Sequence, residues 1–289
     1  MSRIFLAGAT GAVGRQLLPK LVADGHQVTA LTRRTADAAR LWAQGVEAVV
    51  GDVFDADGLR TAVAAAEPEV VMHQLTDLGG LDFAANARIR KAGTRNLVDA
   101  ALAAGVRRMV VQSIAWVYEP GAEPADERTP LDLAAQSETR RGTVESVATM
   151  EELAAKLPEW VVLRYGLLYG PGTWYSPGGL MTEPGKLVAN ADVSSFLHVE
   201  DAAGAAVEAL AWPTGVVNVM DDVPAPASEW APAFARAMGS PVPEVVEGER
   251  NGWARGADNS FAREDLEWTP LHRSWRDGFA QTAAGPGGA

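Results

Sequence analysis

The sequence predicts an α/β fold built on a doubly wound parallel sheet, with a smaller lobe formed by the C-terminal part of the chain. Short β-branched runs alternate with Ala- and Leu-rich stretches of helical pattern through the first half. After Gly166 the alternation stops, and glycine, proline and tryptophan become frequent, as in YGPGTWYSPGG (Tyr169–Gly179). The 289 residues suffice for one large α/β domain with an appended lobe, or for two small domains.

The strands of the first half can be placed by their β-branched runs. We expect helices between them, one of which is predicted over Leu81–Ala104, where Gly93 is interpreted as a position that eases packing. The six predicted strands are Ile4–Ala7, Gln27–Leu31, Ala48–Val50, Val70–Gln74, Arg108–Gln112 and Trp160–Arg164.

The first strand leads into a glycine-rich turn with the spacing Gly8-x-x-Gly11-x-x-Gly14, and a helical pattern follows it directly. Gly8 permits the tight turn, Gly11 lets the backbone approach a pyrophosphate, and Gly14 lets the helix pack on the sheet. The helix N-terminus adds amide N–H groups and the positive end of its dipole. An ordinary turn between a strand and a helix is the alternative. The context favours a dinucleotide site that comprises Gly8, Thr10, Gly11, Ala12, Val13 and Gly14.

Composition restricts the partners of such a site. Lys and Arg total 25 against 37 Asp and Glu, and the net charge of −12 argues against nucleic acid or an anionic membrane as the main partner. The chain has no cysteine, which excludes disulfides, thiolate nucleophiles and Cys-ligated metals, and we expect no metal in the site. No apolar run reaches membrane-spanning length and the N-terminus lacks a signal-peptide pattern, so we expect a cytoplasmic protein with a small-molecule substrate.

Eight separated stretches, taken in order, resemble one family. They are GATGAVG (Gly8–Gly14), GDVFD (Gly51–Asp55), VVMHQ (Val70–Gln74), GTRNLVDAA (Gly93–Ala101), GVRRMVVQS (Gly105–Ser113), LRYGLLYGPG (Leu163–Gly172), FLHVEDAA (Phe196–Ala203) and VVNVMDD (Val216–Asp222). On these stretches the chain resembles extended-type members of the short-chain dehydrogenase/reductase superfamily, and it is similar to NAD(P)-dependent epimerase/dehydratase proteins.

The resemblance and the change of composition after Gly166 together predict the domain organisation. We expect a Rossmann-type dinucleotide-binding domain over residues 1–166, to which residues 193–220 return, and a mainly substrate-binding lobe over residues 167–280. Residues 281–289, which include the sequence TAAGPGGA, are expected to form a disordered tail. A homodimer is an expectation that comes from the family alone.

The resemblance also implies cofactor contacts beyond the glycine turn. Asp52 and Val53 fall where the family holds the adenine ring, and Gln74, Leu75 and Thr76 fall where the end of the fourth strand lines the cofactor. Each of these two sets has ordinary turn residues as its alternative. The contacts implied at the nicotinamide end are Tyr165, Gly166 and Leu168.

The end of the second predicted strand indicates which cofactor is bound. NAD-specific proteins usually place an acidic side chain there for the ribose 2′-hydroxyl, whereas this chain has Arg33 and Arg34. A guanidinium can make paired hydrogen bonds to a phosphate, so the pair favours NADP(H) over NAD(H). The alternative is a solvated pair of arginines at a helix start.

The chain departs from the family at its proton-transfer pair. Extended members use a Tyr and a Lys four residues later, and the Lys lowers the pKa of the phenol. None of the four tyrosines of this chain has a Lys four residues after it. Alignment of the helical stretch TVESVATMEELA on Glu151 puts Thr143 at the Tyr position and Val147 at the Lys position. The chain therefore resembles the atypical branch of the superfamily.

Other polar residues are candidates to replace this pair. For proton transfer we consider Tyr118, Ser113 and Tyr169, although Tyr118 also has a structural interpretation as a ring packed under the following loop. His73 ends the fourth predicted strand, and His198 is interpreted as structural. The residues expected to line a pocket for a flat or apolar substrate are Trp116, Trp174 and Tyr175.

Three functions remain open at this point. The first is an NADP(H)-dependent oxidoreductase, a ketone or enone reductase or dehydrogenase, that acts on a small aromatic or polycyclic metabolite. The second is a redox-neutral epimerase, dehydratase or cyclase. The third is a non-catalytic NADP(H)-sensing or scaffold protein, since binding of a cofactor does not prove turnover. The intact glycine turn and the arginine pair favour use of the cofactor, and we rank the three functions in this order.

Overall fold

The computed structural model describes residues 1–77 and 82–285. Their contacts divide the chain into two compact units. The first unit comprises residues 1–113, 133–163 and 206–216, and the second comprises residues 114–132, 164–205 and the chain from 217 onward. None of the helices within the described residues has the length and apolar character that crossing a bilayer requires.

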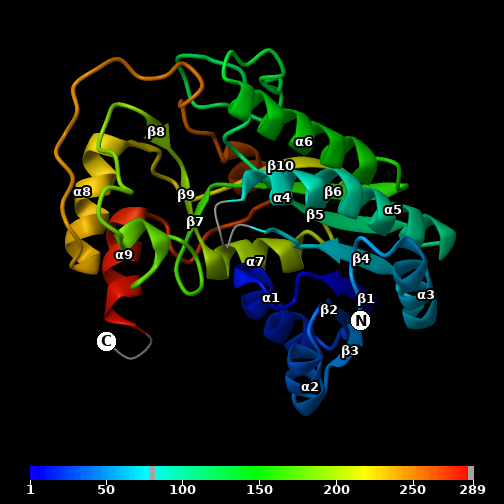
Figure 1. Cartoon of the computed structure of the whole chain (residues 1–289). Helices are drawn as coiled ribbons and strands as arrows, with labels where there is room; N and C mark the ends of the chain where they lie inside the picture. The colour runs from blue at the N-terminus through cyan, green and yellow to red at the C-terminus, as the bar shows by residue number, and fades with distance from the viewer. Residues whose placement is uncertain (78–81, 286–289) are drawn as a thin grey trace. The chain divides into compact units, whose positions relative to one another are not determined.

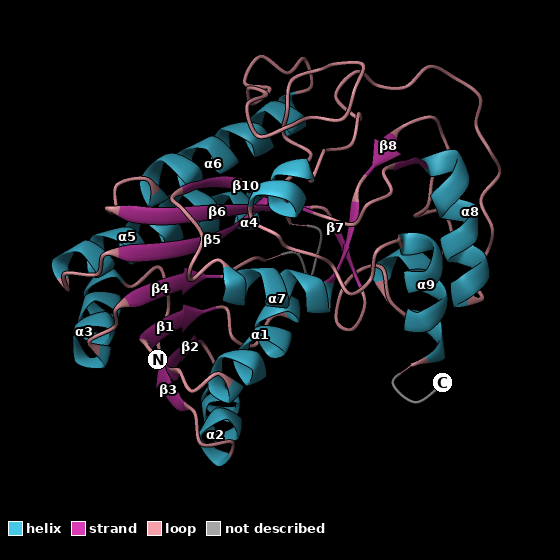
Figure 2. Cartoon of the chain, turned by 180° about the vertical axis from the view of Figure 1, so that it is seen from behind, coloured by secondary structure: helices cyan, strands magenta, loops and turns pink. Residues whose placement is uncertain are grey.

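A seven-stranded sheet has the order β10-β6-β5-β4-β1-β2-β3 (Figures 1 and 2). The pairs from β3 through β2, β1 and β4 to β5 are parallel, with Leu6 beside both Ala30 and Met72. Because β2 and β4 lie on opposite sides of β1, the sheet is doubly wound, and the predicted fold class is confirmed. All six predicted strands are confirmed to within two residues: β1 Arg3–Ala7, β2 Gln27–Thr32, β3 Glu47–Val50, β4 Val70–His73, β5 Arg108–Ile114 and β6 Glu159–Tyr165, with β10 Gly215–Val219 at the edge.

Helices cover both faces of this sheet in the first unit. Figure 1 shows α1 (Ala12–Ala23) and α2 (Thr35–Ala43) on one face, and α3 (Ala56–Ala66) and α5 (Thr94–Ala103) on the other. The second of these faces also carries α6 (Glu138–Ala154), and its core joins side chains of all three helices to β1, β4 and β5. Val71, Met109 and Val111 in this core are completely buried, as strands covered on both faces require.

The helix predicted over Leu81–Ala104 is interrupted. Leu81 lies outside the described residues, and the rest divides into α4 (Phe83–Arg88), a π-helical turn over Ile89–Gly93, and α5. Gly93 closes this turn, and a Cβ atom there would lie 3.1 Å from Cγ1 of Val53, which supports its interpretation as a close-packing position. A π-turn of this kind often marks a functional segment in a helix.

The second unit has little regular structure and an aromatic core. Two short pairs of strands, β7 (Leu167–Tyr169) with β9 (Phe196–His198) and β8 (Val193–Ser194) with β11 (Ala225–Pro226), lie among long loops. The rings of Tyr175, Phe196 and Phe234 pack edge to face in the core. The remaining elements are a short turn of helix over Leu180–Thr182, α7 (Val199–Glu208), α8 (Ala227–Met238), a π-turn over Phe261–Asp265, and α9 (Trp275–Ala284). Residues 206–208 at the end of α7 belong to the first unit. Residues 281–284 of the expected disordered tail are helical, so the expectation is wrong for them, and residues 286–289 lie outside the described part of the chain.

Candidate active site

The glycine turn of the first unit has the geometry that its spacing predicts. Gly8 has a φ of +104°, and a Cβ atom there would collide with the carbonyl group of Gln74. A Cβ atom at Gly14 would collide with the Gly8 carbonyl. At Gly11, which caps α1 without a side-chain hydrogen bond, a Cβ atom would meet only the Gly8 carbonyl oxygen at 3.4 Å. The fold therefore requires glycine at positions 8 and 14, whereas position 11 has space beside it.

A pocket of about 230 Å³ opens beside this turn, within the first unit. Its lining includes Leu31, Gly51, Phe54 and Ile89, which the sequence did not single out. Ala12, Val13, Gly14 and Arg34 are not among the lining residues. The predicted cofactor residues that do line it are Gly8, Thr10, Gly11, Arg33, Asp52, Val53, Gln74, Leu75 and Thr76.

The side chain of Gln74 is an unusual feature of this pocket. It is 3 % exposed, and neither its Oε1 nor its Nε2 atom has a hydrogen-bond partner among the described residues. An unpaired buried amide costs free energy, roughly 1–3 kcal/mol per group. Because the residue lines the pocket, a polar ligand there can supply the missing partners, so the donor and acceptor set fits a nucleotide cofactor.

The two arginines after β2 differ in their surroundings. Arg33 lines the pocket, is exposed, and forms no ion pair with any residue of the described chain. Nε of Arg34 lies 2.6 Å from Oδ2 of Asp37, which also pairs with Arg40. Of the pair, Arg33 alone is placed to meet a group in this pocket.

The predicted nicotinamide-end residues lie in the second unit. The Tyr165 hydroxyl donates a 3.0 Å hydrogen bond to the carbonyl oxygen of Ala202, and its ring is buried. The amide of Gly166 donates to the carbonyl oxygen of Val219, and Leu168 lies in β7. Their contact with a cofactor stays a prediction.

Thr143 and Val147, which the sequence alignment on Glu151 puts at the family's proton-transfer positions, both lie on α6. The Thr143 hydroxyl donates to the Thr139 carbonyl oxygen at 3.0 Å, and Val147 is fully buried. One turn further, Oε1 of Glu151 accepts a 2.7 Å hydrogen bond from the buried hydroxyl of Ser113. Neither helix position offers an acid with a pKa near neutrality.

A buried arginine belongs to the same region and was not identified from the sequence. Nη1 of Arg90, on the π-turn, lies 3.4 Å from the hydroxyl of Ser146. Burial lowers the pKa of Arg90 to about 10, and the charge of Glu151 acts in the opposite direction. The signal was a basic residue within an apolar helical pattern, but no sequence rule pairs it with α6.

The two candidate tyrosines are both enclosed. The Tyr118 hydroxyl donates to Oδ1 of Asn218, and the guanidinium of Arg164 lies 4.9 Å from its ring centre. Tyr169 is fully buried among Phe196, Phe279 and other rings, and its hydroxyl has no partner among the described residues. Burial raises the pKa of Tyr169 well above its ordinary value, so its phenol stays protonated at neutral pH.

The second unit contains a pocket of its own, of about 310 Å³. Trp116 and Tyr175 line it, whereas Trp174 packs against the aromatic core and is not among the lining residues. That a substrate binds there stays a prediction. The lining residues that the sequence did not single out include Lys186, Leu187, Asp192 and Trp230, and Trp253, which the sequence suggested as a packing residue, lines the pocket too. The pocket therefore combines an aromatic wall with one cation and one carboxylate.

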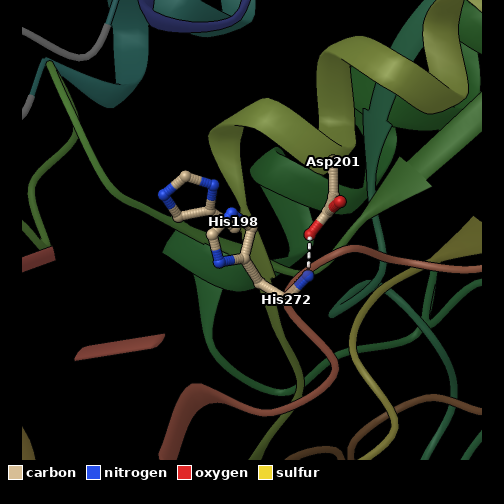
Figure 3. A group of neighbouring side chains, drawn as sticks. All are labelled: His198, Asp201 and His272. Carbon is tan, nitrogen blue, oxygen red and sulfur yellow. Dashed lines mark hydrogen bonds between the residues drawn. The ribbon is translucent and has the colours of Figure 1, made fainter. Parts of the chain in front are cut away.

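Besides the two pockets, the second unit contains a cluster of three titratable side chains, His198, Asp201 and His272 (Figure 3). Both oxygens of Asp201 accept backbone N–H groups, from Leu271 at 2.7 Å and from His272 at 3.0 Å. The centre of the His198 ring lies 3.7 Å from that of the His272 ring, and burial lowers the pKa of His198 to about 4. The cluster holds the chain at 271–272 against the start of α7, which favours the structural interpretation of His198.

Comparison with known proteins places this arrangement in a family. The family model described as NAD(P)H-binding matches residues 8–213. A 3-diazoavenalumate denitrifying reductase of a Streptomyces species is 45 % identical over 96 % of this chain and 99 % of its own length. A UDP-glucose 4-epimerase of Mycolicibacterium smegmatis is 28 % identical over 97 % of both chains.

Solved structures show the same fold. The Bordetella bronchiseptica enzyme WbmG, in complex with NAD and UDP, superposes with a TM-score of 0.78 at 23 % identity, over 98 % of this chain and 93 % of its own. The UDP-glucose 4-epimerase of Thermus thermophilus, in complex with NAD, gives 0.76 at 24 % identity over 97 % of both chains. The chain therefore belongs to the NAD(P)H-binding family, and it is an NAD(P)-dependent enzyme of the extended short-chain dehydrogenase/reductase type.

Proposed function

We propose that this protein is an NAD(P)H-dependent reductase that replaces the diazonium group of an aromatic molecule by hydrogen and releases dinitrogen. The name of the Streptomyces relative describes reductive loss of nitrogen from a diazo compound. Identity of 45 % over nearly the full length of both chains supports the same class of reaction here.

One observation carries the proposal: no tyrosine of the chain has a lysine four residues after it. Thr143 and Val147, which the alignment puts at the family's proton-transfer positions, cannot exchange a proton near neutral pH. A ketone that accepts hydride becomes an alkoxide and needs an acid. An aryl diazonium cation that accepts hydride gives a neutral arene and dinitrogen, and the sum consumes no proton. The proposed substrate therefore needs no Tyr–Lys pair, whereas the ketone or enone predicted from the sequence does.

The surrounding residues support this choice. The Ser113 hydroxyl already donates to Glu151, and the Tyr118 hydroxyl donates to Asn218. The phenol of Tyr169 is buried with a raised pKa. Each of the three candidate acids is therefore engaged or enclosed, which disfavours a reaction that draws a proton from them.

We assign the cofactor to the pocket of the first unit. Gly11 leaves room for the pyrophosphate, the Gln74 amide lacks partners, and Arg33 is free to bind a 2′-phosphate. The bound nicotinamide supplies the hydride. We propose NADPH rather than NADH, because Arg33 stands where NAD-specific members usually carry an acid.

A redox-neutral epimerase is the competing proposal, since WbmG is bound to UDP and other relatives act on UDP-glucose. An epimerase oxidises a substrate hydroxyl and must remove its proton, which again requires the missing base. The pocket of the second unit also has Lys186 as its one cation, whereas a pyrophosphate carries at least two charges. Both observations favour the diazonium reductase.

The test uses an aryl diazonium carboxylate, 4-carboxybenzenediazonium with a ¹⁵N-labelled diazo group, and the full-length protein. We expect one ¹⁵N₂, one benzoate and one oxidised cofactor per turnover, by mass spectrometry and absorbance. Mixtures without protein, and mixtures with a variant designed not to bind the cofactor, measure the spontaneous reaction. Loss of NADPH only with an enone such as 4-phenylbut-3-en-2-one would restore the ketone or enone assignment, and no oxidation with either substrate would contradict both.

A further inference from the structure

The pocket of the second unit contains a cation without a partner. Lys186 lies on the irregular segment between the helical turn Leu180–Thr182 and β8, and its side chain is exposed. It forms no ion pair with any residue that the structure describes. Trp116, Trp230 and Trp253 line the same pocket. A lysine that lines the same pocket as three tryptophans predicts a ligand that is flat at one end and anionic at the other.

The one carboxylate of the pocket is held by neutral groups. Oδ1 of Asp192 accepts the backbone N–H of Asn251 at 2.8 Å, and the side-chain amides of Asn190 and Asn251 donate to its Oδ2 atom. Asp192 therefore fixes the loop that carries it to the segment at 251. Lys186 stays available for a group that comes from outside.

We propose that Lys186 binds the carboxylate of an aromatic monocarboxylate substrate whose ring packs against the tryptophans of this pocket. This assignment rests on the proposed function and adds the substrate's anionic group to it. The net charge of −12 makes a local cation necessary, because an anionic ligand is otherwise repelled. An ammonium on a flexible stem suits a single carboxylate, whereas tight binding of a diphosphate calls for paired guanidinium groups.

The experiment measures binding without any redox step. Cinnamate, which has an aromatic ring and a carboxylate but no diazo group, is titrated into the full-length protein, and the fluorescence of the pocket tryptophans reports binding. We expect Lys186→Ala to weaken cinnamate binding about 10-fold, as for one charge-assisted contact near the surface. Lys186→Arg should retain most of the affinity.

Two controls make the test specific. Methyl cinnamate has the same ring without the charge, so its affinity should be equal in the parent and in Lys186→Ala. Lys156→Ala removes an exposed lysine from the first unit, changes the net charge by the same amount, and should leave cinnamate binding unchanged. Equal losses for the acid and the ester, or for both lysine variants, would overturn the proposal.

A further arm separates this inference from the proposed reaction. Because cinnamate cannot lose nitrogen, its Lys186-dependent binding stands even if the diazonium compound is never reduced. UDP is titrated in parallel, and Lys186-dependent binding of UDP in preference to cinnamate would assign the pocket to nucleotides and overturn the carboxylate assignment.

Discussion

The hydroxyl of Ser113, near the end of β5, donates a 2.7 Å hydrogen bond to the carboxylate of Glu151 on α6. Both residues are buried, and the positive charge of Arg90 acts on the same carboxylate. A serine that donates to an anion is a poor source of a proton for a substrate. The hydrogen bond links β5 to α6, and we propose that this is the role of Ser113; its action as an acid stays an untested prediction.

The first prediction concerns these polar side chains. If diazonium reduction needs no protein acid, Ser113→Ala and Tyr118→Phe should each lower turnover less than about 5-fold, whereas removing a general acid costs about 10²–10⁴-fold. Ser113→Ala should still lower the free energy of unfolding by about 1–3 kcal/mol, because Glu151 loses its partner. Single-turnover absorbance at the reduced nicotinamide and urea unfolding measure the two effects. A turnover loss above 100-fold in either variant would reinstate side-chain acid catalysis.

The second prediction separates the two arginines after β2. Arg33→Ala should lower NADPH affinity about 10- to 100-fold and leave NADH affinity nearly unchanged, because a charged hydrogen bond to the 2′-phosphate is lost. Arg34→Ala should have a smaller effect, since Arg34 pairs with Asp37. Calorimetric titration of both cofactors against the unmutated protein and both variants gives the six affinities. Equal affinities of the unmutated protein for NADPH and NADH would refute the NADP(H) assignment.

The third prediction uses the unequal space around the glycines. Gly11→Val should abolish cofactor binding and leave the fold largely intact, because its side chain enters the space of the pyrophosphate rather than a packed contact. Gly14→Ala, although smaller, should destabilise the protein, since its Cβ atom collides with the Gly8 carbonyl. Thermal unfolding and cofactor titration on both variants check the contrast. Normal binding by a folded Gly11→Val protein would place the phosphates elsewhere.

The fourth prediction concerns the unpaired amide of Gln74. Gln74→Leu keeps the bulk and removes two unsatisfied groups, so we expect the free energy of unfolding without cofactor to stay the same or to rise by up to about 1 kcal/mol. Cofactor affinity should fall about 10-fold if the amide bonds to the cofactor. Denaturation and calorimetry on the same sample test both statements. A variant that loses stability and keeps its affinity would show that the amide serves the fold.

The fold was accessible from the sequence because its signals are local. The predicted strands are short apolar runs with β-branched residues, and the glycine turn marks the point where a strand passes into a helix. The π-turn over Ile89–Gly93 was not predicted, because it accompanies a tertiary contact: the hydroxyl of Thr94 lies 2.8 Å from Nε2 of His73. Periodicity does not register a contact between a helix and a distant strand.

The site was accessible only in part for the same reason. Residues on the turns after β1, β2 and β4 could be placed, since these turns meet at one edge of a parallel sheet. The pairing of Ser113 with Glu151 joins positions 38 apart, and Lys186 reaches its pocket on a segment without regular structure. Neither a period nor a spacing rule exists for such contacts, so three-dimensional packing had to reveal them.

The last prediction concerns pH and His73, which is fully buried at the end of β4. Its Nδ1 atom accepts the backbone N–H of Leu75, and its Nε2 atom faces the Thr94 hydroxyl, so the ring is held neutral with its proton on Nε2. Burial lowers its pKa from 6.5 to about 4, and the charge of Arg90 adds to this effect. Because the folded pKa lies below the unfolded one, this contribution to stability is complete above pH 6.5 and is lost as the pH falls toward 4.

Protonation of His73 at low pH should also disturb the cofactor pocket. Leu75 lines this pocket, and a protonated Nδ1 atom would face the Leu75 N–H as a second donor. We expect the free energy of unfolding to fall by about 2–4 kcal/mol between pH 7 and pH 4 through this residue, and cofactor affinity to fall with it. His73→Asn keeps hydrogen-bonding atoms and does not titrate, so its unfolding free energy should depend less on pH, whatever its absolute value. His198, whose pKa is also lowered to about 4, contributes in the same direction and remains in the variant as an internal reference. Urea unfolding at four pH values between 7 and 4 gives the change of the unfolding free energy with pH for the parent and for His73→Asn. Equal changes in the two proteins would show that His73 contributes nothing to the acid sensitivity.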